Sequence, residues 1–196
     1  MTSPRDRRFG LADAMILVAA IGVGLALARM MERLTFAYYE VVYYSPFSTV
    51  VRDDPSTRGL FERLVFRSFV LLPAFATSFT WAMLAIRLRA PRPPLRRLAR
   101  QPGAVACAVA TMATAIVAMH CLILTLLNQK YSNYQMNFVP LALDVGWAVS
   151  GAWATLLLAG RWRPEPSWID RGGRCLGLVW ILMVVLFYVA VYAEVL

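Results

Sequence analysis

The sequence is poor in the residues that bind metals and build disulfide frameworks. It has one histidine, His120, and three cysteines, all in or beside long apolar segments. Structural zinc needs three or four His, Cys or carboxylate ligands, and neighbours such as His120 and Cys121 point about 100° apart on a helix. The chain also lacks a phosphate-binding glycine loop and the H-E-x-x-H and G-x-S-x-G motifs. We therefore expect no cofactor, no metal site and no catalytic residue, in a protein that is not an enzyme.

Charged residues are scarce as well. They make up 16% of the 196 residues, and hydrophobic residues make up 60%, whereas about a quarter of a soluble domain is charged. The apolar excess falls into five blocks, each long enough to cross about 30 Å of hydrocarbon as a helix. The blocks are 11–28, 68–86, 104–127, 141–160 and 175–193. The sequence therefore predicts an all-α polytopic transmembrane bundle of five spans, a single membrane domain over residues 1–196 in contact with the lipid bilayer.

Lysine is nearly absent, and the positive charge is arginine gathered in particular loops. The net charge is +9, and of the 20 basic residues only Lys130 is not arginine. Segment 87–103 has six arginines and no acid, and the N-terminus and segment 161–174 carry further arginines. Segment 128–140 has Lys130 alone. Cytoplasmic loops hold the Arg and Lys excess, so the alternation predicts N-in/C-out threading in the inner membrane of a bacterium. Because topology accounts for the basic charge, we expect no nucleic-acid partner.

The first span has an alternative interpretation as a cleaved signal peptide. A basic start, an apolar run and the end Ala26-Leu27-Ala28 form the pattern that signal peptidase cuts. Cleavage would leave four spans in the same orientation. We favour an uncleaved span, because Met30 and Met31 follow without the start of a soluble mature chain.

The predicted external loop, 29–67, is long and contributes to an aromatic outer face. Segments 35–47 and 130–138 hold most of the tyrosines, and tyrosine favours the membrane interface. Asp54-Pro55 has the form of an N-cap followed by a first helical residue, and an apolar stripe comes after it. The pattern predicts an amphipathic helix over 56–66 that lies on the outer surface.

Small side chains mark the expected helix contacts, because helices in lipid associate by close backbone approach. The third block opens AVACAVATMATA, with Ala106, Ala110, Thr114 and Ala118 spaced as one ridge. The fifth block, LVWILMVVLFYVAVY, is bulky throughout. The third span is therefore predicted to be central, and the fifth to be peripheral, facing lipid or another subunit.

The second and fourth blocks share a pattern. SFTWAML (78–84) and SGAWATL (150–156) both read S-x-x-W-A-x-L, and both run into an Arg/Pro turn. A tandem duplication of helical hairpins would produce this likeness. Coincidence in a chain rich in Ala, Leu, Trp and Arg is the open alternative.

Few ionisable residues fall inside the blocks, where each is costly and therefore a candidate for function. Asp13, near the start of the first block, is expected to cap the helix or to meet an arginine. His120 and Asp144 lie near the outer ends of the third and fourth spans. These spans form an antiparallel hairpin, so the two side chains are a candidate intramembrane polar pair in which the carboxylate orients the imidazole. The alternative is a structural His120 packed against the fourth span.

The opening stretch RRFGLADAMILVAAIGVGLALAR (7–29) resembles the N-terminal span of a set of uncharacterised bacterial multi-span membrane proteins. The resemblance covers about a tenth of the chain. It implies a bacterial membrane protein and brings no activity, cofactor or site residue with it.

These observations favour an interaction or accessory subunit of a membrane assembly, which contacts other subunits through the fifth span or the aromatic outer face. One alternative is a small transporter or channel, which needs a polar path through the bundle. The residues available for such a path are Thr77, Ser78, Thr80, Thr111, Thr114, His120, Asp144 and Ser150. A second alternative is a membrane-embedded enzyme that uses His120 and Asp144.

Overall fold

The computed structural model describes residues 9–43, 60–89, 94–126 and 138–192, and these residues form helices joined by short connections. The helices are α1 (Leu11–Tyr43), α2 (Leu60–Leu88), α3 (Leu95–Leu98), α4 (Pro102–Leu126), α5 (Phe138–Leu158) and α6 (Trp168–Tyr192). All but the short α3 are long and apolar enough to cross a membrane. The prediction of an all-α fold with five spans is confirmed, and the helices are compatible with a multi-pass integral membrane protein.

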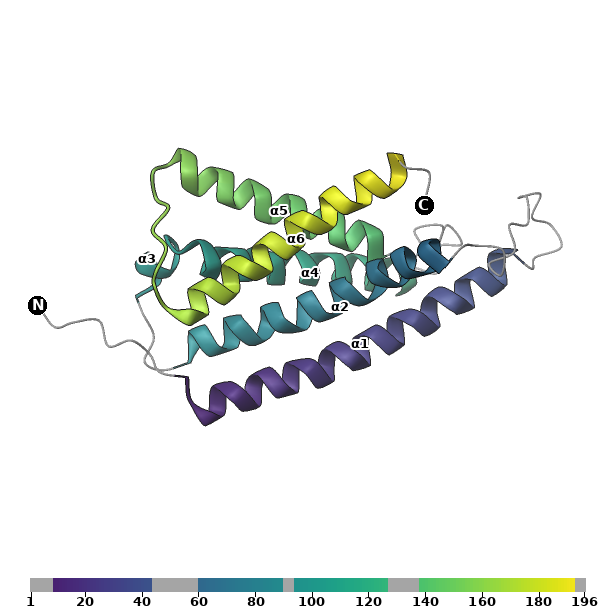
Figure 1. Cartoon of the computed structure of the whole chain (residues 1–196), viewed down its shortest axis with the longest axis horizontal. Helices are drawn as coiled ribbons and strands as arrows, with labels where there is room; N and C mark the ends of the chain where they lie inside the picture. The colour runs from purple at the N-terminus through teal and green to yellow at the C-terminus, as the bar shows by residue number, and fades with distance from the viewer. Residues whose placement is uncertain (1–8, 44–59, 90–93, 127–137, 193–196) are drawn as a thin grey trace, which may run out of the picture.

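The arginine-rich segments gather at one end of the bundle. The start of α1, helix α3 and the connection between α5 and α6 lie at the same end, and the C-terminal ends of α1 and α6 lie at the other (Figure 1). This arrangement agrees with the predicted alternation of loops. The N-in/C-out orientation itself stays a prediction.

The prediction that the third span is the central one is not confirmed, because α2 packs against α1, α4, α5 and α6 and has a larger buried share than α4. Helix α4 nevertheless uses its small residues for packing. It packs against α2, α5 and α6. Ala106, Ala110 and Thr114 of the predicted ridge are buried, and Ala118, one turn further on, is exposed. The core that these alanines face is filled from the other helices, chiefly by Val145 of α5 and Trp180 of α6. Small residues on one helix thus make room for bulky residues on its neighbours.

The prediction that the fifth span is peripheral is wrong. Helix α6 packs against α2, α4 and α5, and Trp180 and Met183 on it are each only 1% exposed. The close approach comes from α5, where a Cβ added at Gly146 would lie 2.7 Å from the Trp180 carbonyl oxygen. The bulky sequence of α6 hid its contacts, because the small residues that permit them lie partly on the partner helix. Its opposite face, which includes Leu182 and Leu186, is exposed.

Helix α1 is the peripheral helix instead. It packs mainly along α2 (Figure 1), where a Cβ added at Gly24 would lie 2.7 Å from the Phe75 ring. Leu11, Met15 and Val18 are exposed on its other sides. Asp13 accepts a hydrogen bond from the Gly10 backbone N–H at 3.1 Å and lies 3.9 Å from a guanidinium nitrogen of Arg89. Asp13 therefore both caps the helix and meets an arginine, as expected.

The described part of the predicted surface helix over 56–66 is not separate from the second span. Residues 56–59 lie outside the described residues, and from Leu60 the chain belongs to α2, which continues through Pro73 to Leu88. Helix α1 likewise continues to Tyr43, into the predicted external loop. Its 33 residues span about 50 Å at 1.5 Å per residue, more than the hydrocarbon thickness. The hydropathy of the sequence predicts where a helix leaves the bilayer. It does not predict where the helix ends, because backbone hydrogen bonding continues beyond the apolar segment.

The tandem duplication that the shared S-x-x-W-A-x-L pattern of the second and fourth spans suggests stays a prediction. The two tryptophans differ in their surroundings. Trp81 is 44% exposed, whereas the indole N–H of Trp153 donates a hydrogen bond to the Pro102 carbonyl oxygen at 3.0 Å.

Candidate functional site

A cluster of charged and polar side chains closes the arginine-rich end of the bundle. Its first member is Arg87, in the last turn of α2, which is only 8% exposed. The Arg87 Nη2 group donates to Gln101 Oε1, and to Glu165 Oε2 at 2.6 Å. Gln101 immediately precedes α4, and Glu165 lies in the connection between α5 and α6. One guanidinium therefore joins the ends of three elements.

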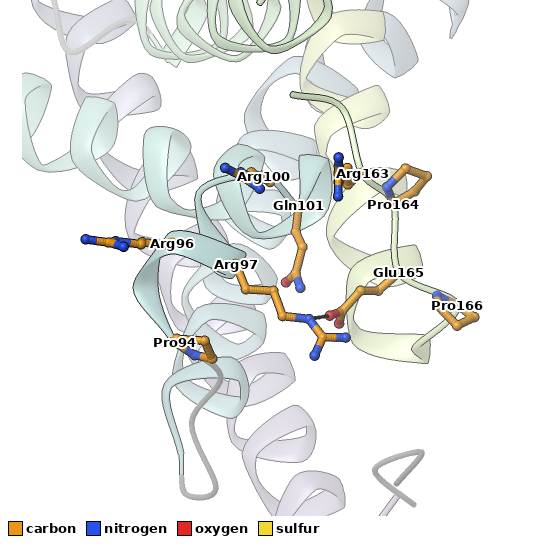
Figure 2. A pocket seen from close by; sticks show the side chains of 9 residues that line it. All are labelled: Pro94, Arg96, Arg97, Arg100, Gln101, Arg163, Pro164, Glu165 and Pro166. Carbon is orange, nitrogen blue, oxygen red and sulfur yellow. Dashed lines mark ion pairs between the residues drawn. The ribbon is translucent and has the colours of Figure 1, made fainter. Parts of the chain in front are cut away.

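Glu165 is the acid at the centre of this cluster. Its Oε2 atom accepts from Arg87, and its Oε1 atom lies 2.5 Å from Arg97 Nε in α3. Figure 2 shows Arg97 and Glu165 pointing toward one another across the gap between α3 and the α5–α6 connection. The side chain of Glu165 is 16% exposed, so this carboxylate is shielded from water and both of its oxygens are occupied. Such a pair stabilises mainly because removing either partner leaves a poorly solvated charge.

Asp170, in the first turn of α6, is the second acid of the cluster, and its side chain is fully buried. One carboxylate oxygen accepts the Gly103 backbone N–H at 3.0 Å, and the other accepts the Glu165 backbone N–H at 3.1 Å. Arg174 Nε lies 3.4 Å from Asp170, an ion pair without hydrogen-bond geometry. The carboxylate thus satisfies free backbone donors at the start of α4 and just before α6, where a helix leaves its first N–H groups unpaired.

Glycines allow α4 and α6 to meet at this point. A Cβ added at Gly173 would lie 2.6 Å from the Gly103 carbonyl oxygen, and one added at Gly103 would collide with the backbone of Asp170. The hydrogen bond from Gly103 to Asp170 needs this short distance between the two backbones. A cavity of about 10 Å³ remains beside Arg87, Cys107 and Asp170, close to the smallest volume that holds one water molecule. The cluster is therefore tightly packed. We call it the polar clasp, and its residues are Arg87, Arg97, Gln101, Glu165 and Asp170.

A larger hollow opens next to the clasp. It has a volume of about 540 Å³ and lies between α3 with its following turn and segment 163–166 (Figure 2). Four arginines, three prolines, Gln101 and Glu165 line it. The arginines are Arg96, Arg97, Arg100 and Arg163. The volume falls in the range of small-molecule sites, and the lining is strongly basic.

The predicted polar pair, His120 and Asp144, is not joined by a contact in the described part of the chain. His120 is exposed near the end of α4, and Asp144 is exposed near the start of α5. No hydrogen bond or ion pair between described residues includes either side chain. The pairing stays a prediction, and the expected packing of His120 against the fourth span is not seen.

The hydroxyl groups named as a thin polar path mostly bond within their own helices. Thr80 donates to the Ala76 carbonyl oxygen at 2.5 Å, and Ser150 donates to the Gly146 carbonyl oxygen at 2.8 Å. Ser78, Thr111 and Thr114 likewise donate to carbonyl oxygens three or four residues earlier. Thr80 also accepts from the indole N–H of Trp180 at 3.3 Å. These hydroxyls are therefore satisfied by protein atoms, whereas the buried Thr77 Oγ1 has no hydrogen-bond partner among the described residues.

The sequence interpretation missed the clasp, although two signals for it were present. Glu165 and Asp170 are the acids in an otherwise arginine-rich segment, 161–174. In addition, Ser167 and Asp170 have the S-x-x-D spacing that precedes a helix. The Asp170 backbone N–H indeed donates to Ser167 Oγ, at 3.4 Å. As a result α6 begins at Trp168, seven residues before the predicted span at 175.

Comparison with known proteins identifies no relative of the chain. No family model, curated protein or solved structure matches the chain. The resemblance of residues 7–29 to uncharacterised bacterial multi-span membrane proteins therefore stays a prediction.

Proposed function

We propose that the protein is a non-enzymatic accessory subunit of an assembly in the bacterial inner membrane. It binds another membrane protein through α5, which is the fourth span. The observation that carries this proposal is an exposed face on that helix. Asp144, Trp147 and Gly151 are all exposed, and their spacing of three and four residues places them on one side of the helix. Trp147 is 58% exposed, and a Cβ added at Gly151 would meet no atom within 4 Å.

The chemistry of this face fits a neighbouring transmembrane helix better than lipid. An ionisable side chain in lipid is costly, by about 2.5–3.5 kcal/mol at the centre of a span and less toward its ends. A partner helix that donates a hydrogen bond to Asp144 would remove that cost. Glycine permits the close backbone approach on which helix association in lipid depends. A tryptophan beside it adds a large contact area.

The transporter and enzyme alternatives find less support among the described residues. A path for solutes needs polar groups that face a water-filled space, whereas the hydroxyls of Thr80, Thr111 and Ser150 bond to their own helices. A site built on His120 and Asp144 needs the two side chains to meet, and both are exposed without a joining contact. An interaction role requires neither feature.

Photo-crosslinking in native membranes tests the proposal. A benzophenone amino acid placed at Trp147 should give a protein adduct, and one placed at Val18, which is 67% exposed on α1, should react with lipid alone. Asp144→Asn should weaken the adduct at position 147, because the carboxylate is the strongest acceptor on the face. Absence of a protein adduct at position 147, or equal adducts at both positions, would refute the α5 interface.

A further inference from the structure

The basic hollow at the arginine-rich end has a charge that the described protein residues do not neutralise. Glu165 is the acid in its lining. Both oxygens of that carboxylate are already occupied, one by Arg87 at 2.6 Å and one by Arg97 at 2.5 Å. Within the described segments, Arg96, Arg100 and Arg163 form no ion pair. Arg100 and Arg163 therefore place two unpaired guanidinium groups beside a space whose own acid is already paired, whereas the Arg96 side chain points away from them (Figure 2).

Gln101 adds a buried donor to the same wall. The residue is 1% exposed, and its Oε1 atom accepts from Arg87. Because arginine only donates, this contact fixes which end of the amide is oxygen. The Nε2 group is left buried without a hydrogen-bond partner. Figure 2 shows the Gln101 amide pointing toward the Arg97–Glu165 pair inside the lining. A buried N–H without an acceptor is rare in folded proteins.

The walls of the hollow are held in place before any ligand arrives. Pro94 lies at one side, and Pro164 and Pro166 lie at the other, and each proline ring fixes its backbone φ. The Arg163 backbone N–H donates to the Arg100 carbonyl oxygen at 3.0 Å, which ties the two walls together. A preorganised wall lowers the ordering cost of binding.

The hollow also lies where a membrane-spanning bundle meets its headgroup layer. The candidate spans of α2 and α5 end at Leu88 and Leu158, and those of α4 and α6 begin at Pro102 and Trp168. The lining residues come from segments 94–101 and 163–166, just outside these limits. Basic pockets at this level of membrane proteins bind anionic headgroups.

We propose that this hollow binds a phosphate group, held by Arg100 and Arg163 with the Gln101 amide as a further donor. The planar guanidinium presents paired N–H donors that match phosphate oxygens. An anionic phospholipid headgroup and a soluble phosphate compound share this chemistry. The hollow is lined by residues that follow the end of α5, whereas Asp144 lies six residues from the start of that helix. The phosphate site can therefore be tested independently of the proposed α5 interface.

Binding measurements on the purified full chain in neutral detergent test the proposal with two probes, inorganic phosphate and short-chain phosphatidylglycerol. The double variant R100Q/R163Q should bind at least tenfold more weakly than the wild type. The control variant R161Q/R171Q removes exposed arginines that lie outside the lining, and it should bind like the wild type. Thermal unfolding should be alike in all three, because the substituted side chains are exposed.

The two probes separate the sources of the phosphate. Displacement of phosphatidylglycerol by inorganic phosphate would identify a soluble phosphate compound as the ligand. Binding of phosphatidylglycerol that inorganic phosphate does not displace would identify a lipid headgroup. Failure of both probes to bind the wild type, or equal binding by the double variant R100Q/R163Q and the control, would overturn the proposal.

Discussion

Replacing Asp170 by asparagine tests the polar clasp with almost no change of shape. Each carboxylate oxygen accepts one backbone N–H, from Gly103 at 3.0 Å and from Glu165 at 3.1 Å. The amide of asparagine keeps one acceptor oxygen and turns an NH2 group toward the other donor. One hydrogen bond to a charged group is lost, at a cost of about 1.5–3 kcal/mol, and a buried N–H is left facing a second donor.

We expect a lower melting temperature in detergent, where tryptophan fluorescence measures the thermal unfolding. Each kcal/mol shifts the melting temperature of a chain of this length by about 2–4 °C, so Asp170→Asn should melt roughly 3–12 °C below the wild type. Asp144→Asn is the matched control, because it makes the same chemical change at an exposed position, and its melting temperature should equal that of the wild type. If the two variants melt together, the clasp does not stabilise the bundle.

Two further substitutions examine the packing of α5 and the polar pair. Gly146→Val should destabilise the chain by about 1–3 kcal/mol through overpacking against α6, since its Cβ would lie 2.7 Å from the Trp180 carbonyl oxygen. Thermal unfolding should show no loss of stability for the control Gly151→Val. Similar losses of stability in the two variants would contradict the α5–α6 contact. The imidazole NMR signals of His120, the single histidine, should have the same chemical shifts in the wild type and in Asp144→Asn, because no contact joins the two side chains in the described residues. A changed chemical shift would restore the pair as a joined site.

The sequence was sufficient for features that depend on composition along a single helix. Helix number and type follow from apolar blocks of membrane length. The burial of Ala106 and Ala110 follows from the need for close approach in lipid. Asp13 pairs as expected because the Gly10 N–H lies at the start of its own helix, α1, and Arg89 directly follows the end of the neighbouring helix α2.

Features that depend on contacts between distant segments escaped the sequence interpretation. Segment WIDRGGR, 168–174, reads as a polar loop, yet it is the start of α6, and its Asp170 carboxylate receives N–H groups from Gly103 and Glu165. Hydropathy cannot reveal those donors. One face of the bulky fifth span, with Trp180 and Met183, is buried because Gly146 on α5 makes room for it.

Helix rotation explains why connectivity alone did not bring His120 and Asp144 together. A short loop sets two residues at similar depth, but packing decides which face of each helix turns inward. In α5 the buried side is set by Ala142, Val145 and Val149. Each residue turns the helix by about 100°, so Asp144 faces away from that side and is exposed.

Topology labelling in intact cells tests most directly the central claim that the arginine-rich end, with its clasp and hollow, is the cytoplasmic end of a five-span bundle. In a chain whose native cysteines are replaced by alanine, Ser132→Cys should react with a membrane-impermeant maleimide. Leu95→Cys, on the exposed surface of α3, should react only after the cells are permeabilised. Labelling of position 95 from outside, with position 132 protected, would contradict the account.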